Sequence, residues 1–307
     1  MTEPIFLQGI CKDYLWGGNR LREEYGKKSD ADKIAESWEL ACHKDGSSIL
    51  TTGADAGKDL REYLDEHGTG FLGTNCAGCT TVPVLIKLID AKQDLSIQVH
   101  PDDDYAMRVE GEPGKTEMWY IMDAAPGAAL YYGLNRAVSK EEFAKRIQEQ
   151  TLTEILNRVE VKPGELYFIP SGTLHAICKG VVVAEVQQNS NVTYRVYDYG
   201  RVGADGKPRA LHVKQALEVM RRTPPEQHDF SPHLAKCDYF TVDVVAGGYT
   251  GTADETSFVS LLITEGEGRL TCGGETVQAK KGDSFFITAG SGAYALTGSC
   301  KALLTTV

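Results

Sequence analysis

The sequence predicts a mainly β protein built from two jelly-roll barrels in tandem, with a small helical insertion. Short apolar or alternating segments recur between regular turns, which is typical of barrels of antiparallel strands. The last stretch, residues 238–307, consists of such segments throughout and is rich in Gly and Thr. In addition, residues 163–175 align without gaps on residues 281–293, at an offset of 118 residues. This internal repeat predicts two copies of one β module.

The domain organisation follows from this repeat and from the length of 307 residues, which is enough for two domains. We expect a catalytic domain over residues 1–221 with a helical insertion around 139–157, a linker over 222–237, and a second β domain over 238–307. At the start of the insertion, Ser139 is followed three positions later by Glu142, which is the pattern of a helix capping box.

The composition excludes some classes of function. The net charge of −11 argues against nonspecific binding of nucleic acid. No apolar run is long enough to span a bilayer and the first residues do not resemble a signal peptide, so we expect a cytoplasmic protein that does not bind membranes. Its eight cysteines are then expected to be reduced. Cys76 and Cys79 form a Cys-x-x-Cys pair without a second pair at zinc-ribbon spacing, which favours a loop with two incidental thiols.

The strongest functional signal begins in residues 94–100, which alternate along a predicted strand. Gln98 and His100 fall on its polar face, and an edge strand with one solvated face would also explain this pattern. Glu117 shares a face with apolar residues of a second predicted strand, where a buried carboxylate needs a cation nearby. His175 follows a Pro-Ser-Gly turn and has become Ala293 in the second copy of the repeat.

Two histidines and one carboxylate form the donor set of a catalytic metal site. We therefore predict that His100, Glu117 and His175, with Gln98 as a fourth ligand, bind one Zn²⁺ per chain in the first barrel only. One coordination position would be left for water or substrate. Taken singly, each histidine would be interpreted as a core residue, and only their joint occurrence beside Glu117 favours the metal.

Four motifs, in the same order along the chain, resemble the short bacterial form of type I mannose-6-phosphate isomerases. They are residues 98–101 (Gln-Val-His-Pro), 114–120 (Gly-Lys-Thr-Glu-Met-Trp-Tyr), 170–176 (Pro-Ser-Gly-Thr-Leu-His-Ala) and 188–198 (Gln-Asn-Ser-Asn-Val-Thr-Tyr-Arg-Val-Tyr-Asp). The likeness covers most of the chain and begins near Trp16. It implies cupin barrels, one zinc ion per subunit and a small sugar phosphate as the substrate, with interconversion of mannose 6-phosphate and fructose 6-phosphate.

The resemblance also implies residue roles. His100, Glu117 and His175 match the metal ligands of the family, and Gln98 matches a fourth ligand seen in some members. Arg195 matches the active-site arginine and could stabilise an enediolate by roughly 3 kcal/mol. From the pattern alone, Arg195 would be interpreted as a partner of Asp198 or Glu185 in a salt bridge.

Lys115 is a candidate for phosphate binding or acid–base catalysis, although an exposed loop lysine is its simpler interpretation. The general base is not fixed, because Asp198, Lys115 and a zinc-bound water all stay open. The subunit state, monomer or homodimer, also stays open.

Two other classes share part of this pattern. A non-haem Fe(II) oxygenase uses the same donor set of two histidines and one carboxylate on a cupin barrel. A sugar-binding cupin without catalysis is the second alternative. The sequence contains no helix-turn-helix pattern or basic segment, which argues against a regulator that binds DNA.

Overall fold

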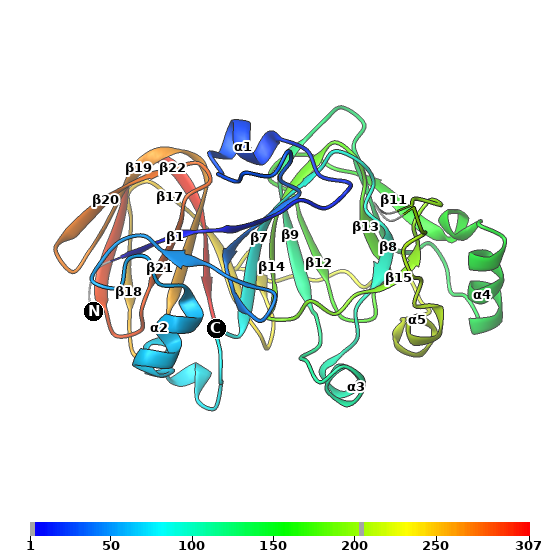
Figure 1. Cartoon of the computed structure of the whole chain (residues 1–307), viewed down its shortest axis with the longest axis horizontal. Helices are drawn as coiled ribbons and strands as arrows, with labels where there is room; N and C mark the ends of the chain where they lie inside the picture. Colours follow the sequence, from blue (N-terminus) through cyan, green and yellow to red (C-terminus); the bar gives the residue numbers. More distant parts are fainter. Residues whose placement is uncertain (1–3, 203–205) are drawn as a thin grey trace. The chain divides into compact units, whose positions relative to one another are not determined.

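The computed structural model describes residues 4–202 and 206–307, and most of its regular structure is β, as predicted (Figure 1). The chain forms two compact units. The first unit contains Met1–Lys12, Asn19–Leu88 and Phe230–Val307, and the second contains Asp13–Gly18 and Ile89–Asp229. β7 (Val84–Ala91) carries the chain from the first unit into the second. The division into a catalytic domain, a linker and a second domain at residues 221 and 237 stays a prediction.

The first unit is built around an antiparallel sheet in the order β16-β17-β22-β19-β21-β1-β6, in which β18 also pairs with β22 and β20 with β19. These strands are β1 (Ile5–Gln8), β6 (Ile49–Leu50), β16 (Ala235–Lys236), β17 (Thr241–Ala246), β18 (Tyr249–Ala253), β19 (Val259–Cys272), β20 (Glu275–Lys280), β21 (Ser284–Ile287) and β22 (Gly292–Thr306). The first unit also contains β2 (Ile10–Lys12), β3 (Glu36–Leu40), β4 (Cys42–His43), β5 (Gly46–Ser47), α1 (Arg20–Tyr25), α2 (Leu60–His67) and the 3-10 turns η1 (Gly70–Leu72) and η2 (Thr74–Cys76).

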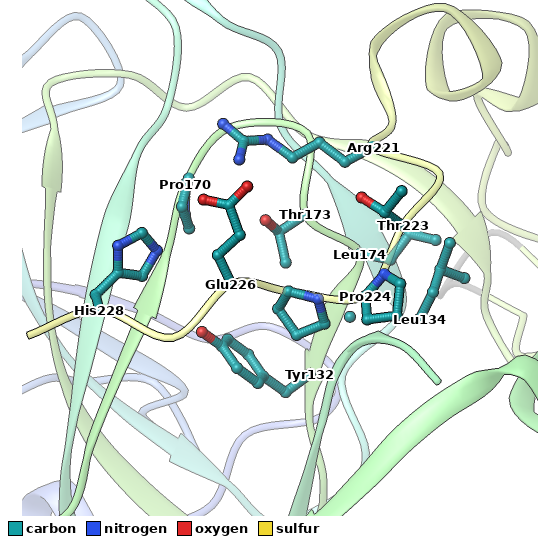
Figure 2. Close-up of a pocket in the computed structure, with 12 residues that line it drawn as sticks. Tyr132, Leu134, Pro170, Thr173, Leu174, Arg221, Thr223, Pro224, Glu226 and His228 are labelled. Atoms are coloured by element: carbon teal, nitrogen blue, oxygen red, sulfur yellow. The ribbon is translucent and has the colours of Figure 1, made fainter. Parts of the chain in front are cut away.

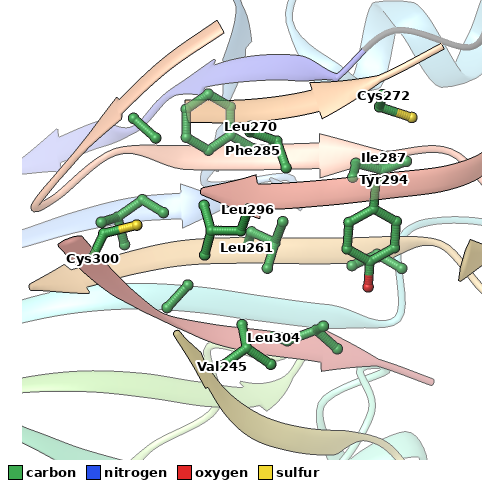
Figure 3. Packing of buried hydrophobic residues seen from close by; sticks show 14 of the residues in the cluster. Val245, Leu261, Leu270, Cys272, Phe285, Ile287, Tyr294, Leu296, Cys300 and Leu304 are labelled. Carbon is green, nitrogen blue, oxygen red and sulfur yellow. The ribbon is translucent and has the colours of Figure 1, made fainter. Parts of the chain in front are cut away.

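Alternating side chains of these long strands fill the interior of the first unit. Figure 3 shows Leu261, Phe285, Leu296 and Leu304 among the residues of this core, and each is at most 5% exposed. Ala293, the residue aligned with His175, lies on β22 and pairs with Thr252 of β18. The aliphatic and aromatic side chains that the structure describes in this core pack together and include no histidine or carboxylate that could bind a metal.

The second unit has two antiparallel sheets. One has the order β11-β10-β13-β8-β15, and in the other β9 pairs with both β12 and β14. The strands are β8 (Ile97–Val99), β9 (Glu117–Ala124), β10 (Ala129–Leu134), β11 (Leu156–Glu160), β12 (Leu166–Ile169), β13 (His175–Ile177), β14 (Val181–Gln188) and β15 (Tyr194–Tyr197). The helices are α3 (Asp103–Val109), α4 (Lys140–Gln148), α5 (Val213–Val219) and the 3-10 turn η3 (Leu152–Ile155).

The helices α4 and α5 cover the outer face of the β10-β13-β8-β15 sheet. Ile97 and Val99 of β8 pack in one buried cluster with Phe143 of α4 and Ala216 of α5. The apolar face of the predicted strand 94–100 is therefore covered by helices, and its polar face points to the opposite side of the sheet. Among the described residues, no helix combines the length and the hydrophobicity that crossing a bilayer requires.

The helical insertion differs from the prediction in two details. The hydroxyl of Ser139 caps α4 by accepting a hydrogen bond from the Glu142 backbone N–H, but the Glu142 carboxylate binds Arg136. A guanidinium outside the helix therefore replaces the second half of the capping box. The later part of the predicted insertion contains only the turn η3, because the chain joins the sheet as β11 from Leu156 onward.

The internal repeat appears in the backbone at the predicted offset. β12 and β21 occupy aligned positions, as do two glycines with left-handed backbone, Gly172 (φ +84°) and Gly290 (φ +76°). Each glycine ends the turn between the two strands of its repeat, where a positive φ disfavours any side chain. The sequence alignment thus identified a repeated structural unit.

Candidate metal centre

One row of side chains crosses the β10-β13-β8-β15 sheet. Tyr132 pairs with His175, His175 pairs with Gln98, and Gln98 pairs with Arg195. Residues directly opposite one another in antiparallel strands project from the same face. His100 is two positions beyond Gln98 and follows the same parity. The strand registers therefore bring four of the predicted site residues, Gln98, His100, His175 and Arg195, to one face.

Glu117 approaches these residues from the other sheet, where it begins β9. Its Oε1 lies 3.3 Å from His175 Nε2, and its Oε2 lies 3.7 Å from His100 Nε2. The two Nε2 atoms are 3.1 Å apart. One ligand atom from each of the three residues falls within 4.8 Å of the others, and all three side chains are buried. The three predicted ligands thus converge on one point between the sheets.

The orientation of both imidazole rings suits a cation. His100 Nδ1 lies 2.8 Å from the Val192 carbonyl oxygen, and His175 Nδ1 lies 2.8 Å from the Thr173 carbonyl oxygen. A carbonyl oxygen only accepts, so each Nδ1 carries the proton and each Nε2 presents a lone pair. Two lone pairs and a carboxylate that face one point repel one another unless a cation lies there. The donor set therefore fits a divalent metal with imidazole and carboxylate ligands.

The burial of His175 keeps its ring neutral. It is 0% exposed, and the indole of Trp119 packs edge-on against it with ring centroids 5.3 Å apart. Burial lowers the pKa of His175 to about 4. A neutral imidazole is the form that ligates a metal. Gln98 completes this group, since its side-chain Nε2 lies 3.4 Å from His175 Nε2, and rotation of the amide would present its oxygen instead.

Lys115 is buried beside the predicted ligands, not exposed in a loop. Its Nζ lies 2.6 Å from Glu117 Oε2, 3.3 Å from His100 Nε2 and 3.6 Å from Glu185 Oε1. Glu185 is itself held by the Trp119 indole N–H at 2.8 Å. The sequence did not identify Trp119 and Glu185 as part of this group. These two residues face each other because β14 pairs with β9 in one register. That pairing joins segments far apart in the chain, so local sequence patterns do not reveal it.

Arg195 makes neither of the salt bridges that its sequence pattern suggested. Its Nε donates to Ser96 Oγ at 3.1 Å and its Nη1 donates to the Ala210 carbonyl at 3.2 Å. Asp198 is bound by Arg201 and by Arg209, whose Nε lies 2.7 Å from Asp198 Oδ2. Burial opposes ionisation of Asp198, but these two guanidinium groups outweigh it and hold the pKa of its carboxyl below the usual range. Asp198 is thus poorly suited to act as a general base.

A segment after α5, residues 221–228, crosses the turn that supports His175. Arg221 donates from its backbone N–H to the Gly172 carbonyl at 2.8 Å, and Gly172 donates to the His100 carbonyl at 2.8 Å. Figure 2 shows Arg221 and Glu226 beside Pro170 and Thr173 of this turn, in a pocket that also includes Tyr132 and His228. The 221–228 segment therefore fixes the turn whose Thr173 carbonyl orients the His175 ring.

Comparison with known proteins identifies the relatives of this chain. The sequence model for "Phosphomannose isomerase type I, catalytic domain" matches residues 5–126, and that for "Mannose-6-phosphate isomerase, cupin domain" matches residues 231–307. Mannose-6-phosphate isomerase ManA of Bacillus subtilis (strain 168) is 39% identical over 315 residues, which cover 99% of this chain and 98% of the relative. The chain belongs to the type I mannose-6-phosphate isomerase family.

Two further members of the family extend the comparison. The mannose-6-phosphate isomerase of Streptococcus mutans is 36% identical, and the match covers 94% of this chain and 93% of that protein. The crystal structure of the mannose 6-phosphate isomerase from Bacillus subtilis has a TM-score of 0.91 and 36% identity, and the match covers 99% of this chain and all of that one. The predicted family and the predicted cupin fold are therefore confirmed.

Proposed function

We propose that this protein is a zinc-dependent isomerase that interconverts mannose 6-phosphate and fructose 6-phosphate through an enediolate. The convergence of His100 Nε2, His175 Nε2 and the Glu117 carboxylate carries the proposal, because two imidazoles and one carboxylate are the donor set of a divalent metal. Membership of the isomerase family and the names of its relatives support the substrate and the reaction. The proposed ligands are these three residues and Gln98, with one zinc ion per chain.

The proposed zinc ion would act as a Lewis acid, which stabilises negative charge on the sugar oxygens by several kcal/mol. The protein residues orient that site. The Val192 and Thr173 carbonyls keep each Nδ1 protonated, so both Nε2 atoms stay available. The buried position of Glu117 removes competing water, which strengthens every charge interaction there.

We assign Lys115 to the acid–base work of the reaction. Its ammonium lies within 4 Å of the Glu117 and Glu185 carboxylates, so a proton can be held and exchanged inside the site. General acid–base catalysis contributes typically 10²–10⁴-fold to a rate. The burial of Lys115, which is 4% exposed, favours this role over binding a phosphate at the surface.

We assign binding of the substrate's phosphate group to three arginines, of which Arg195 pairs with Gln98 across the sheet. Arg195, Arg201 and Arg209 bring three guanidinium groups around a single Asp198 carboxylate, which leaves an excess of positive charge in a protein of net charge −11. Phosphate is bound well by guanidinium groups, because their N–H donors match its oxygens in pairs. Arg195 lies next to the proposed metal ligand Gln98 and would also stabilise the enediolate oxygens.

A coupled assay with mannose 6-phosphate tests the proposal. The purified protein should convert mannose 6-phosphate, lose this activity after chelation and regain it with one equivalent of Zn²⁺. Iron analysis and oxygen consumption are measured in parallel, because stoichiometric iron with oxygen uptake would indicate an oxygenase. Binding of mannose 6-phosphate without turnover in the zinc-loaded protein would indicate a sugar-binding cupin and reject the isomerase.

A further inference from the structure

The Cys-x-x-Cys motif lies in a tight turn of the first unit, directly after η2. Cys79 donates from its backbone N–H to the Cys76 carbonyl at 2.9 Å, which closes a four-residue turn. Ala77 has φ −58° and ψ 120°, and Gly78 has φ +91°. These are the values of a type II turn, for which glycine is preferred at the third position. The sequence Cys-Ala-Gly-Cys therefore specifies the turn that the structure contains.

This turn brings the two thiols within reach of a covalent bond. A hydrogen-bonded β-turn places its first and fourth Cα atoms less than ~7 Å apart, and disulfides span roughly 4.4–6.8 Å between Cα atoms. The two side chains already interact. Burial, together with the charge and the side-chain hydrogen bond of Cys79, raises the pKa of Cys76 to about 12. Both cysteines are free thiols in this structure.

The two cysteines differ in exposure, so a reagent would meet Cys79 before Cys76. Cys79 is partly exposed, whereas Cys76 is 2% exposed. Two other partly exposed cysteines, Cys11 and Cys237, direct their thiols to carbonyl oxygens of Lys28 and Phe240. Cys79 instead has a second thiol beside it. A disulfide reagent that reaches Cys79 would form a mixed disulfide there. The Cys76 thiol can then attack the Cys79 sulfur and displace the thiol of the reagent.

The segment that leads into the turn is anchored, which holds the turn in place when the thiols react. Thr74 and Asn75 donate from their backbone N–H groups to the carbonyls of Glu255 and Thr256, at 2.9 and 2.8 Å. The Asn75 side chain donates to the Val307 carbonyl at 2.7 Å. Ala77 and Gly78, at the tip, are exposed. A fixed turn with an exposed tip keeps the two cysteines together and leaves the partly exposed Cys79 open to a small reagent.

We propose that Cys76 and Cys79 form a reversible thiol–disulfide site that reacts with small-molecule disulfides such as oxidised glutathione. The Cys79 thiolate attacks one sulfur of the reagent and releases one glutathione thiolate, leaving a mixed disulfide on Cys79. Cys76 then loses its proton to the glutathione thiolate already released, attacks the Cys79 sulfur and releases the second glutathione thiolate. The two protein thiols are oxidised by two electrons, one glutathione disulfide is reduced to two thiols, and these take the two protons. None of the proposed metal ligands takes part in this exchange.

The experiment equilibrates the zinc-loaded full chain in glutathione buffers, followed by acid quenching, alkylation and mass spectrometry. Cleavage after Arg61 and Lys87 yields one tryptic peptide that holds both Cys76 and Cys79 and no other cysteine. We expect this peptide to lose two hydrogens and to escape alkylation, reversibly on addition of dithiothreitol. The oxidised fraction should follow the ratio [GSH]²/[GSSG], as an intramolecular disulfide requires. A peptide that stays reduced, or a fraction that follows [GSH]/[GSSG] with a glutathione adduct, would overturn the proposal.

Matched variants separate the two steps. Cys76→Ser should trap one glutathione on Cys79, because the displacing thiol is gone, and Cys79→Ser should leave Cys76 unmodified. Cys237→Ser is the control and should oxidise at residues 76 and 79 as the unmodified protein does. If Cys76→Ser proves unstable, Cys79→Ser and the control still decide, since glutathione found on Cys76 in Cys79→Ser would contradict the assigned order.

Discussion

Lys115 Nζ lies 2.6 Å from Glu117 Oε2, so the buried carboxylate of the proposed metal centre is already paired with an ammonium from its own strand region. The two residues are separated by one position, and Lys115 is 4% exposed. A lysine in this place balances part of the negative charge of Glu117 and Glu185. This pairing leads to the first prediction.

Lys115→Met should lower kcat about 100-fold or more, because the buried proton carrier is lost. Zinc content should stay at one per chain, since the Glu117 carboxylate no longer has a competing cation. Lys145→Met, at a side chain that is 69% exposed, is the control. The measurement is kcat together with metal analysis. An unchanged kcat would reduce Lys115 to a structural role.

His175→Ala should lose zinc and activity together. Removal of one of three strong ligands should weaken zinc affinity by more than the 10–100-fold that is typical for outer-shell changes. His233→Ala, which removes a partly exposed imidazole that contacts Asp243 in the first unit, should keep both properties. Competition with a fluorescent chelator measures the affinity. Full turnover with retained metal in His175→Ala would reject the ligand assignment.

Arg195→Ala should retain zinc and lose kcat/KM by about 100-fold, the size of one contact to a developing oxyanion. The exposed Arg269 provides the control, and Arg269→Ala should change nothing. Steady-state kinetics with both sugar phosphates, alongside zinc analysis, distinguishes the outcomes. A normal rate in Arg195→Ala would show that this residue has only a structural role, through its hydrogen bonds with Ser96 and Ala210.

Asp198→Asn should destabilise the protein by about 1–3 kcal/mol at neutral pH, because Arg201 and Arg209 lose their shared counter-charge. The pKa of the Asp198 carboxyl is lowered in the folded state, so its stabilisation is complete above its unfolded pKa of about 3.9 and is lost as pH falls through the folded value. The difference in unfolding free energy between wild type and Asp198→Asn should therefore shrink in acid. Urea unfolding of the chelated proteins between about pH 3 and pH 7 checks this, and a constant difference would contradict it.

Gly172→Ala should cost more stability than Gly290→Ala, although the two glycines occupy the same place in the repeat. A Cβ on Gly172 would lie 2.8 Å from the Val219 carbonyl oxygen, whereas one on Gly290 would meet nothing within 4 Å. Gly290→Ala should therefore cost only the backbone strain, about 1–2 kcal/mol. Gly172→Ala should also weaken zinc binding, because the same turn orients His175 through Thr173. Chemical unfolding and zinc titration of both variants provide the test, and equal losses would exclude a role for the 221–228 segment.

Local patterns were sufficient to predict the residues with strict alternation or a repeated motif. The parity of residues 94–100 placed Gln98 and His100 on one face, and the aligned repeat placed β12 and β21 at matching positions. The observed strand is shorter, Ile97–Val99. The residues before it form hydrogen bonds outside a regular strand. The Asp94 carboxylate accepts a hydrogen bond from the Lys179 backbone N–H, and the Leu95 N–H donates to the Ile177 carbonyl.

What local patterns could not supply is the pairing of distant strands. Glu185 joins the site because β14 pairs with β9 in one register, and a shift by one residue would turn it away. Lys115 was expected to be exposed because it stands in a loop of polar and turn-forming residues, and only the arrangement of two sheets around it makes it buried. The partner of Asp198 was mistaken for the same reason, since Arg209 reaches it from the far side of a loop.

The pairing of β1 with β21 has a consequence for synthesis on the ribosome. Residues Ile5–Gln8 are translated long before their partner Ser284–Ile287. The unit that carries the proposed metal centre lies almost wholly within one continuous stretch, Ile89–Asp229, and has its strand partners available much earlier. Domains tend to fold as units while the chain is still being made. The unit holding the proposed zinc ligands can therefore complete its structure during elongation, whereas in the other unit β1 can pair with β6 early but waits for β21 on its other edge.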